Sequence, residues 1–122
     1  MNTAIIMLGS NADAENNLHL AKEKLSARFE IAKESSVVLS KPLGKNYKSD
    51  FLNKAMMLLS DDNEKETVSI FKDIEAEMGR TPTSKSEGII PIDIDLIFWN
   101  DKLASQDYER FDFVRYCINE IK

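Results

Sequence analysis

The run from Ile89 to Trp99 sets two acidic residues, Asp93 and Asp95, among β-branched and aromatic side chains. This composition predicts a β-strand rather than a helix. Because successive side chains alternate between the two faces of a strand, both carboxylates project to the same side. Their Cα atoms would lie about 6.6 Å apart, or two strand rises of roughly 3.3 Å each. The run therefore predicts a sheet strand with an acidic pair on one face.

Two carboxylates held this close repel each other and need a cation or a basic partner nearby. Magnesium is suitable, because it takes one or two carboxylates and completes its coordination with water and substrate phosphates. The simpler alternative is a half-exposed strand whose outer face happens to carry Asp93 and Asp95. The residues alone leave the metal site and the plain strand both open.

Length and charge limit the class of protein. The chain has 122 residues, 43% of them hydrophobic and 30% charged, which fits one globular domain over residues 1–122. The net charge of -5 argues against a nucleic-acid binder or an anionic-membrane binder, since both use a basic face. We find neither an apolar stretch of the roughly 18 residues that a membrane span needs nor a secretory signal, and expect a cytoplasmic protein. The lone Cys117 cannot form an intramolecular disulfide and is expected in the core.

Apolar patterns and turn residues predict the order β-α-β-β-α-β-α. The strands are expected over Thr3–Leu8, Ile31–Leu39, Phe51–Leu59 and the acidic run. The helices are expected after an Asp13 cap, after a turn and cap within Ser60–Asn63, and over Asp112–Ile121. The polar segment Arg80–Gly88 predicts a mobile loop without an element of its own. This order predicts a ferredoxin-like α+β domain, an antiparallel sheet with helices packed on it and the acidic strand in the sheet interior.

Several short motifs occur in the order and at the spacing of one enzyme family. They are Leu8–Asn11, Pro42–Gly44, Phe51–Ala55, Ile74–Glu75 with Met78–Arg80, and Pro91–Phe98. On these motifs the chain resembles 6-hydroxymethyl-7,8-dihydropterin pyrophosphokinase, a family of folate biosynthesis. The tail Asp112–Ile121 is similar to the terminal phenylalanine-containing segment of that family, so the resemblance spans almost the whole chain.

The resemblance implies transfer of pyrophosphate from ATP to the hydroxymethyl group of a reduced pterin, with release of AMP. It assigns Asp93 and Asp95 to a pair of magnesium ions that bridge the triphosphate and the attacking hydroxyl. It assigns Arg80 to phosphate, a role that suits an always-charged guanidinium, and it places Glu75 and Leu96 near the nucleotide. The alternatives are a helix-end cation for Arg80 and a solvated helix residue for Glu75.

The same resemblance assigns a second group of residues to the pterin. They are Ser40, Pro42, Leu43, Phe51, Asn53 and Phe113. The main chain from Ser40 to Leu43 and the Asn53 amide, which donates and accepts at once, would recognise the polar edge of the pterin. The rings of Phe51 and Phe113 would stack on its bicyclic body. Phe113 fits an ordinary core position equally well.

The chain departs from the family pattern where the triphosphate would bind. Ile90 stands where the family has an arginine, Lys85 is the only cation in the loop after Arg80, and no histidine follows the acidic strand. An apolar side chain cannot stabilise charge on a transferring phosphoryl group. Three hypotheses result: a compact pyrophosphokinase, a catalytically silent relative that binds pterin or nucleotide or regulates a partner, and a metal-free interaction domain. We predict the first, and the sequence assigns no oligomeric state.

Overall fold

The computed structural model describes residues 1–42, 47 and 49–122. The strands are β1 (Asn2–Ser10), β2 (Glu30–Glu34), β3 (Val38–Ser40), β4 (Phe51–Ser60), β5 (Asp93–Trp99) and β6 (Lys102–Leu103). The helices are α1 (Ala14–Ser26), α2 (Glu64–Glu77), α3 (Ser84–Glu87), α4 (Asp107–Arg110) and α5 (Asp112–Asn119). Within the described residues, none of these helices combines the length and apolar character that crossing a membrane requires.

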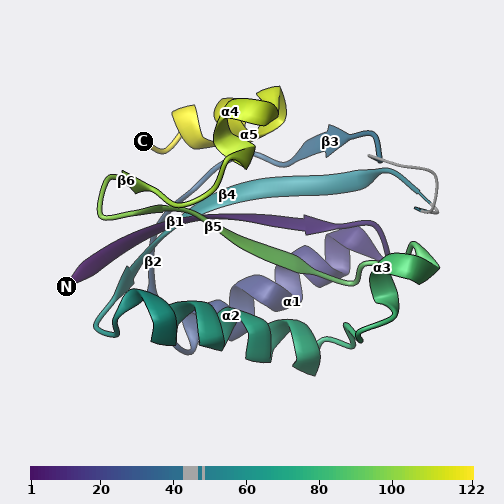
Figure 1. Cartoon of the computed structure of the whole chain (residues 1–122), viewed down its shortest axis with the longest axis horizontal. Helices are drawn as coiled ribbons and strands as arrows, with labels where there is room; N and C mark the ends of the chain where they lie inside the picture. Colours follow the sequence, from purple (N-terminus) through teal and green to yellow (C-terminus); the bar gives the residue numbers. More distant parts are fainter. Residues whose placement is uncertain (43–46, 48) are drawn as a thin grey trace.

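The strands form one antiparallel sheet with β1 at its centre. Its order is β2-β4-β1-β5-β6, and β3 pairs with the other end of β4. Helices α1 and α2 cover one face of the sheet, while α4 and α5 lie on the other (Figure 1). The predicted α+β class is confirmed, and the arrangement is compatible with a ferredoxin-like domain. Strand β5 pairs with β1 along its length, but with the two-residue β6 only at Phe98 and Trp99. The expected place in the sheet interior therefore holds only for the end of β5, and the part with the two acids pairs with β1 alone among the described strands.

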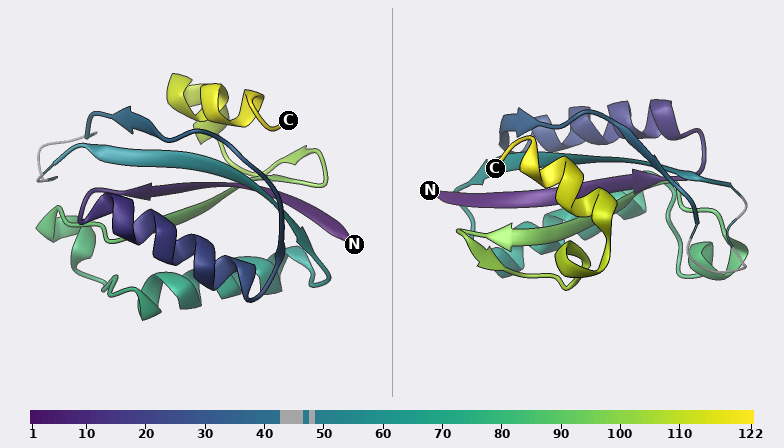
Figure 2. Two further views of the ribbon diagram at one scale, coloured as in Figure 1. Left: turned by 180° about the vertical axis from the view of Figure 1, so that it is seen from behind. Right: turned by 90° about the horizontal axis from the view of Figure 1, so that it is seen from above.

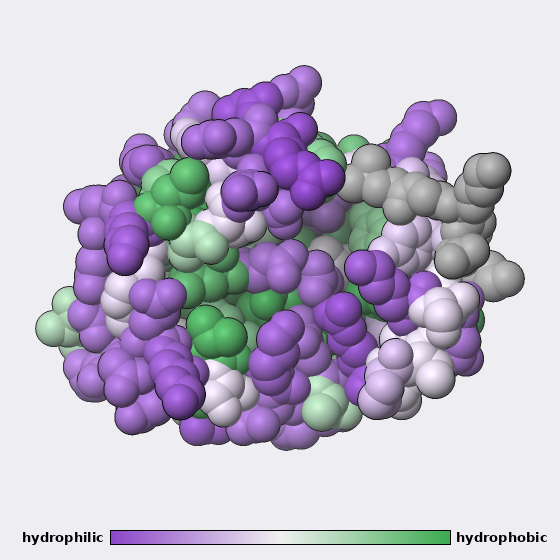
Figure 3. All heavy atoms as spheres, viewed as in Figure 1, coloured by the Kyte–Doolittle hydropathy of each residue, from purple (hydrophilic) through white to green (hydrophobic). Residues whose placement is uncertain are grey.

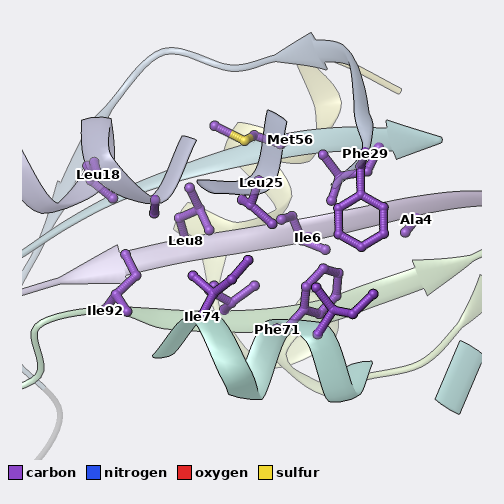
Figure 4. Close-up of a cluster of buried hydrophobic side chains, with 14 residues drawn as sticks. Ala4, Ile6, Leu8, Leu18, Leu25, Phe29, Met56, Phe71, Ile74 and Ile92 are labelled. Atoms are coloured by element: carbon purple, nitrogen blue, oxygen red, sulfur yellow. The ribbon is translucent and has the colours of Figure 1, made fainter. Parts of the chain in front are cut away.

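A large hydrophobic core fills the space between the sheet and helices α1 and α2 (Figure 4). Strand β1 contributes Ala4, Ile6 and Leu8, none of which has any solvent exposure. They pack with Leu18, Ala21 and Leu25 of α1 and with Ile70, Phe71 and Ile74 of α2. Burial of each larger apolar side chain contributes about 1.5–3 kcal/mol, so this layer fixes both helices on the sheet.

A second core lies on the opposite face, beneath α5. The intervening β1 residues Ile5 and Met7 point into it, and they meet Val114, Cys117 and Ile118 of α5. Cys117 is completely buried, which confirms its predicted place. Figure 2, in the view from above, shows α5 crossing only part of this face. Between the two helical layers, apolar side chains show within a rim of polar ones (Figure 3).

The predicted strand Ile31–Leu39 is two strands, so that prediction is wrong. Strand β2 ends at Glu34 and β3 begins at Val38, and both pair with β4. Between them, the Ser35 hydroxyl accepts a hydrogen bond from the Ala55 N–H at 2.8 Å. A serine side chain here replaces a main-chain ladder bond, and apolar periodicity carries no signal for such a replacement.

The predicted loop Arg80–Gly88 contains the short helix α3, so the expectation of no element there is also wrong. The Ser84 hydroxyl accepts a hydrogen bond from the Thr81 N–H at 2.9 Å, which closes a turn at the start of α3. Gly88 then ends the helix with a left-handed φ of 75°. Short polar side chains that suggest a loop in the sequence stabilise a helical turn here.

The acidic strand is shorter than the apolar run, because β5 begins only at Asp93. Pro91 has no N–H to contribute to a ladder. The segment before it is held by Asn11, whose Oδ1 accepts from the Ile90 N–H at 2.7 Å and whose Nδ2 donates to the Gly88 carbonyl at 2.9 Å. A buried side chain at the end of β1 therefore anchors the entry to β5.

The two central helices begin where predicted, but only one cap forms as expected. Asn63 Oδ1 accepts a hydrogen bond from the Glu66 N–H at 2.8 Å and caps α2. Asp13 precedes α1 with a left-handed φ of 45°, and its carboxylate accepts from the Asn16 side chain instead. The predicted side-chain cap at Asp13 is therefore wrong, because its backbone directs the carboxylate elsewhere.

We expect Asn11→Ala to lower the free energy of unfolding by about 2 kcal/mol, because buried main-chain groups of Gly88 and Ile90 would lose their partners. Urea denaturation followed by circular dichroism measures this loss. Asn16→Ala is the control, since Asn16 is exposed, and it should change the stability by less than about 0.5 kcal/mol. Equal effects of the two substitutions would show that Asn11 does not anchor this segment.

Candidate active site

Asp93 and Asp95 project from the same face of β5, as the alternation predicted. Ile94, between them, is buried in the core beneath α1 and α2, so the two acids lie on the opposite face. Leu96 packs against that same core. The structure therefore brings the two carboxylates together but does not bring the Leu96 side chain to them, and the role of Leu96 near a nucleotide stays a prediction.

The surroundings move the pKa values of the two carboxylates in opposite directions. Burial and the adjacent Asp93 carboxylate raise the pKa of Asp95 to about 8. Burial acts in the same direction on Asp93, but a hydrogen bond from Asp95 and the Arg80 guanidinium together hold the pKa of Asp93 below its usual range. Two like charges this close do not both ionise without a cation nearby. The pair is therefore an anion beside a neutral acid until further positive charge reaches it.

Glu75 is buried, with 4% of its surface exposed, so the alternative of a solvated helix residue is wrong. Its Oε2 accepts one hydrogen bond from the Ile94 N–H at 2.8 Å and another from Arg80 Nη1 at 3.1 Å. Because Ile94 lies between the two acids, this carboxylate ties α2 to β5 at the acidic pair. Its role near a nucleotide stays a prediction.

Arg80 reaches the acidic pair from just beyond α2, after a left-handed turn at Gly79. Its Nη1 lies 2.6 Å from Asp93 Oδ1 and 3.3 Å from the Ile92 carbonyl. Burial would lower the pKa of Arg80, but the surrounding carboxylates raise it, with Asp93 the strongest of them. Arg80 is thus a charged member of the site and not only a cation at a helix end.

A cavity of ≈ 160 Å³ opens beside the carboxylates, and we call it the aromatic pocket. It is lined by Met7, Leu8, Gly9, Ser40, Lys41, Tyr47, Phe51, Asn53, Asp93, Asp95, Ile97, Asp107, Phe111, Phe113 and Val114. Tyr47 meets Phe51 edge-on, with ring centroids 5.2 Å apart. Phe111 stacks on Phe113 at 5.7 Å with 22° between the rings. Such flat apolar walls suit a planar heterocycle.

Asn53 gives the aromatic pocket its buried amide. Its Nδ2 donates to the Val38 carbonyl at 3.1 Å and to the Ser40 hydroxyl at 2.8 Å. A Cβ on Gly9 would lie only 3.1 Å from Asn53 Oδ1, so any larger residue at position 9 would crowd the amide. The glycine of the Leu8–Asn11 motif therefore leaves room for this side chain.

The structure gathers most of the predicted pterin residues in one place. Ser40, Phe51, Asn53 and Phe113 all line the aromatic pocket. Pro42 is half-buried nearby in the sequence but is not among the lining residues. Leu43 lies outside the described residues. Their part in binding a pterin stays a prediction.

A second cavity, of ≈ 290 Å³, adjoins the first, and we call it the basic pocket. It is lined by Tyr47, Phe51, Lys72, Arg80, Lys85, Ile90, Asp93 and Asp95. Lys72, Arg80 and Lys85 give it three positive groups, and its acids and two of its rings also line the aromatic pocket. The carboxylate pair therefore stands at the boundary between an apolar, ring-lined space and a cationic one.

The sequence did not predict several of the lining residues, among them Tyr47, Phe111, Lys72 and Asp107. Tyr47 and Phe111 lie a few positions from Phe51 and Phe113, and this spacing was a usable signal. Lys72 lies three residues before Glu75, which places the two on neighbouring positions of one helix surface. Asp107, on the short helix α4, had no signal in the sequence pattern.

Two comparisons with known proteins give a match. Among solved structures, the chain has a weak similarity to the C-terminal domain of the MgtC protein from Mycobacterium tuberculosis. The sequence identity is 11% and the TM-score 0.41, over 79% of this chain and 87% of that one. That similarity is too weak to transfer a fold or a function. Residues 5–122, which include both pockets and the acidic pair, match the family model of 7,8-dihydro-6-hydroxymethylpterin-pyrophosphokinase (HPPK). The chain belongs to this family.

Proposed function

We propose that this protein transfers pyrophosphate from ATP to 6-hydroxymethyl-7,8-dihydropterin in folate biosynthesis, with release of AMP. One observation carries the proposal within a chain of this family: Asp93 and Asp95 stand between a ring-lined pocket and a cationic pocket. Pyrophosphoryl transfer needs two substrates, a flat heterocycle and a polyanion, to meet at a point where charge is neutralised. The two adjoining pockets match these two chemistries.

The two carboxylates fit a magnesium ion whose remaining ligands come from the substrate and water. Asp93 and Asp95 would hold it, and the described part of the chain has no cluster of three or more histidine, cysteine or acidic side chains that could hold a metal alone. A two-carboxylate site suits magnesium, which takes further ligands from water and substrate phosphates. Bound magnesium would neutralise charge on the triphosphate and on the transferring group.

The residues of the chain itself position the two substrates. The rings of Phe51 and Phe113 would hold the pterin, and the Asn53 amide would meet its polar edge, with the hydroxymethyl group toward the acidic pair. Arg80 would bind phosphate from the basic pocket. Its hydrogen bonds to described residues all come from Nη1, so the other guanidinium N–H groups can meet phosphate oxygens while Glu75 still orients it.

We expect AMP to form from ATP, magnesium and 6-hydroxymethyl-7,8-dihydropterin, and Asp95→Ala to lower turnover about a hundredfold or more. Separation of the nucleotides by chromatography measures AMP directly. Asp73→Ala, an exposed position on α2, should leave turnover unchanged. Absence of AMP with well-folded wild-type protein would refute the proposal, and equal turnover of wild type and Asp95→Ala would refute the role of the acidic pair.

We also expect Asp95→Asn to stabilise the metal-free protein at pH 8. The folded state raises the pKa of Asp95 to about 8, so between about pH 4 and pH 8 the folded protein retains a proton that the unfolded chain releases. Stability contributed by this group therefore falls as the pH rises through that window. Thermal unfolding in chelator should give a Tm for Asp95→Asn about 4 °C or more above wild type at pH 8.

The Tm difference between Asp95→Asn and wild type should be smaller at pH 5. At that pH the raised pKa of Asp95 costs the folded wild-type protein less stability. Added magnesium should raise the Tm of wild type at pH 8 more than that of Asp95→Asn, because a ligand that binds only the native state stabilises it. Asp73→Asn is the matched control and should show the same small difference from wild type at both pH values. A Tm gap for Asp95→Asn that is independent of pH would contradict the raised pKa.

A further inference from the structure

The basic pocket has an apolar residue in its wall. Ile90 lines it with 3% of its surface exposed, so this position contributes no charge next to the acidic pair. Asp93 and Asp95 lie in the same wall. A polyanion bound there needs positive charge from elsewhere in the pocket. Arg80 provides some, but its charge is already paired with Glu75 and Asp93.

Lys72 stands on the side of the basic pocket that helix α2 forms. Its neighbours on the helix, Phe71 and Ile74, are anchored in the core (Figure 4), so the backbone at position 72 is held firmly. The Lys72 side chain itself is 61% exposed and can move. It lines the same cavity as Asp93 and Asp95. A polyanion that is bound at the acidic pair is therefore within reach of the lysine.

The ion pair that Lys72 makes is weak enough to be exchanged. Its Nζ lies 3.4 Å from Glu75 Oε1, whereas the shorter bonds of Glu75 go through Oε2 to Arg80 and Ile94. Because the Lys72 ammonium is largely exposed, water and salt screen its attraction to Glu75. A phosphate group offers more acceptor oxygens and more charge, so the ammonium can turn to it at small cost.

We propose that Lys72 is a phosphate-contacting residue. From helix α2 it supplies positive charge to the basic pocket, where the apolar Ile90 supplies none. Its ligand is the polyphosphate chain of a nucleoside triphosphate. The inference rests on the proposed function for the identity of the nucleotide, but not for the binding of polyphosphate.

The experiment is calorimetric titration of inorganic tripolyphosphate with magnesium into wild type, Lys72→Ala, Lys72→Arg and Lys65→Ala. Lys65 is the matched control, because it is exposed on the same helix and lines neither pocket. We expect Lys72→Ala to weaken binding about fivefold or more, the loss of one charge-assisted contact. Lys72→Arg should retain most of the affinity and Lys65→Ala all of it. Circular dichroism checks that each variant is folded.

In the AMP assay, Lys72→Ala should raise the KM for ATP and leave the KM for the pterin unchanged. Equal tripolyphosphate affinities of Lys72→Ala and Lys65→Ala would overturn the inference, as would wild type that does not bind tripolyphosphate. If wild type binds tripolyphosphate through Lys72 but forms no AMP, the proposed function fails and the phosphate contact stands. If AMP forms and Lys72→Ala changes neither the KM for ATP nor the tripolyphosphate affinity, the phosphate contact of Lys72 fails and the proposed function stands.

Discussion

The burial of β1 on both faces is the constraint on which the rest of the structure depends. This strand pairs with β4 on one side and β5 on the other, and its side chains alternate between two cores. Pairing with β1 sets which side chains of β5 face each core, so Ile94 enters the core beneath α1 and α2 and the acids face the other way. A slip of one residue would exchange these faces. The same strand carries Gly9 against Asn53, and Asn11, the residue directly after it, anchors the entry to β5.

Glu75 connects the sheet and helix α2 to the candidate active site. A buried carboxylate is costly unless it is paired and hydrogen-bonded, and this one is satisfied by the Ile94 N–H and by Arg80. The bonds that satisfy Glu75 also join α2 to β5 and hold Arg80 against Asp93. Fold stability and site geometry therefore share one set of contacts, and a change at Glu75 would affect both.

The two pockets differ in how strictly they depend on particular residues. A planar ring is recognised by shape, so the walls given by Phe51 and Phe113 must stand in set positions. A polyphosphate is recognised mainly by charge, which acts over several ångströms and can come from different elements. Under the proposed function, this difference accounts for Ile90 in the wall of the basic pocket, where Lys72 on α2 and Lys85 on α3 also bring positive charge.

The sequence by itself determined the features that depend on local periodicity and local chemistry. These include the antiparallel α+β order, the acidic pair on one face of a strand, a helix cap within Ser60–Asn63 and the burial of Cys117. Only the tertiary structure decided the break at Ser35, the burial of Glu75, and the approach of Asp107 to the acids. Each of these follows from contacts between segments distant in the chain, whose packing and hydrogen bonding leave no local period in the sequence.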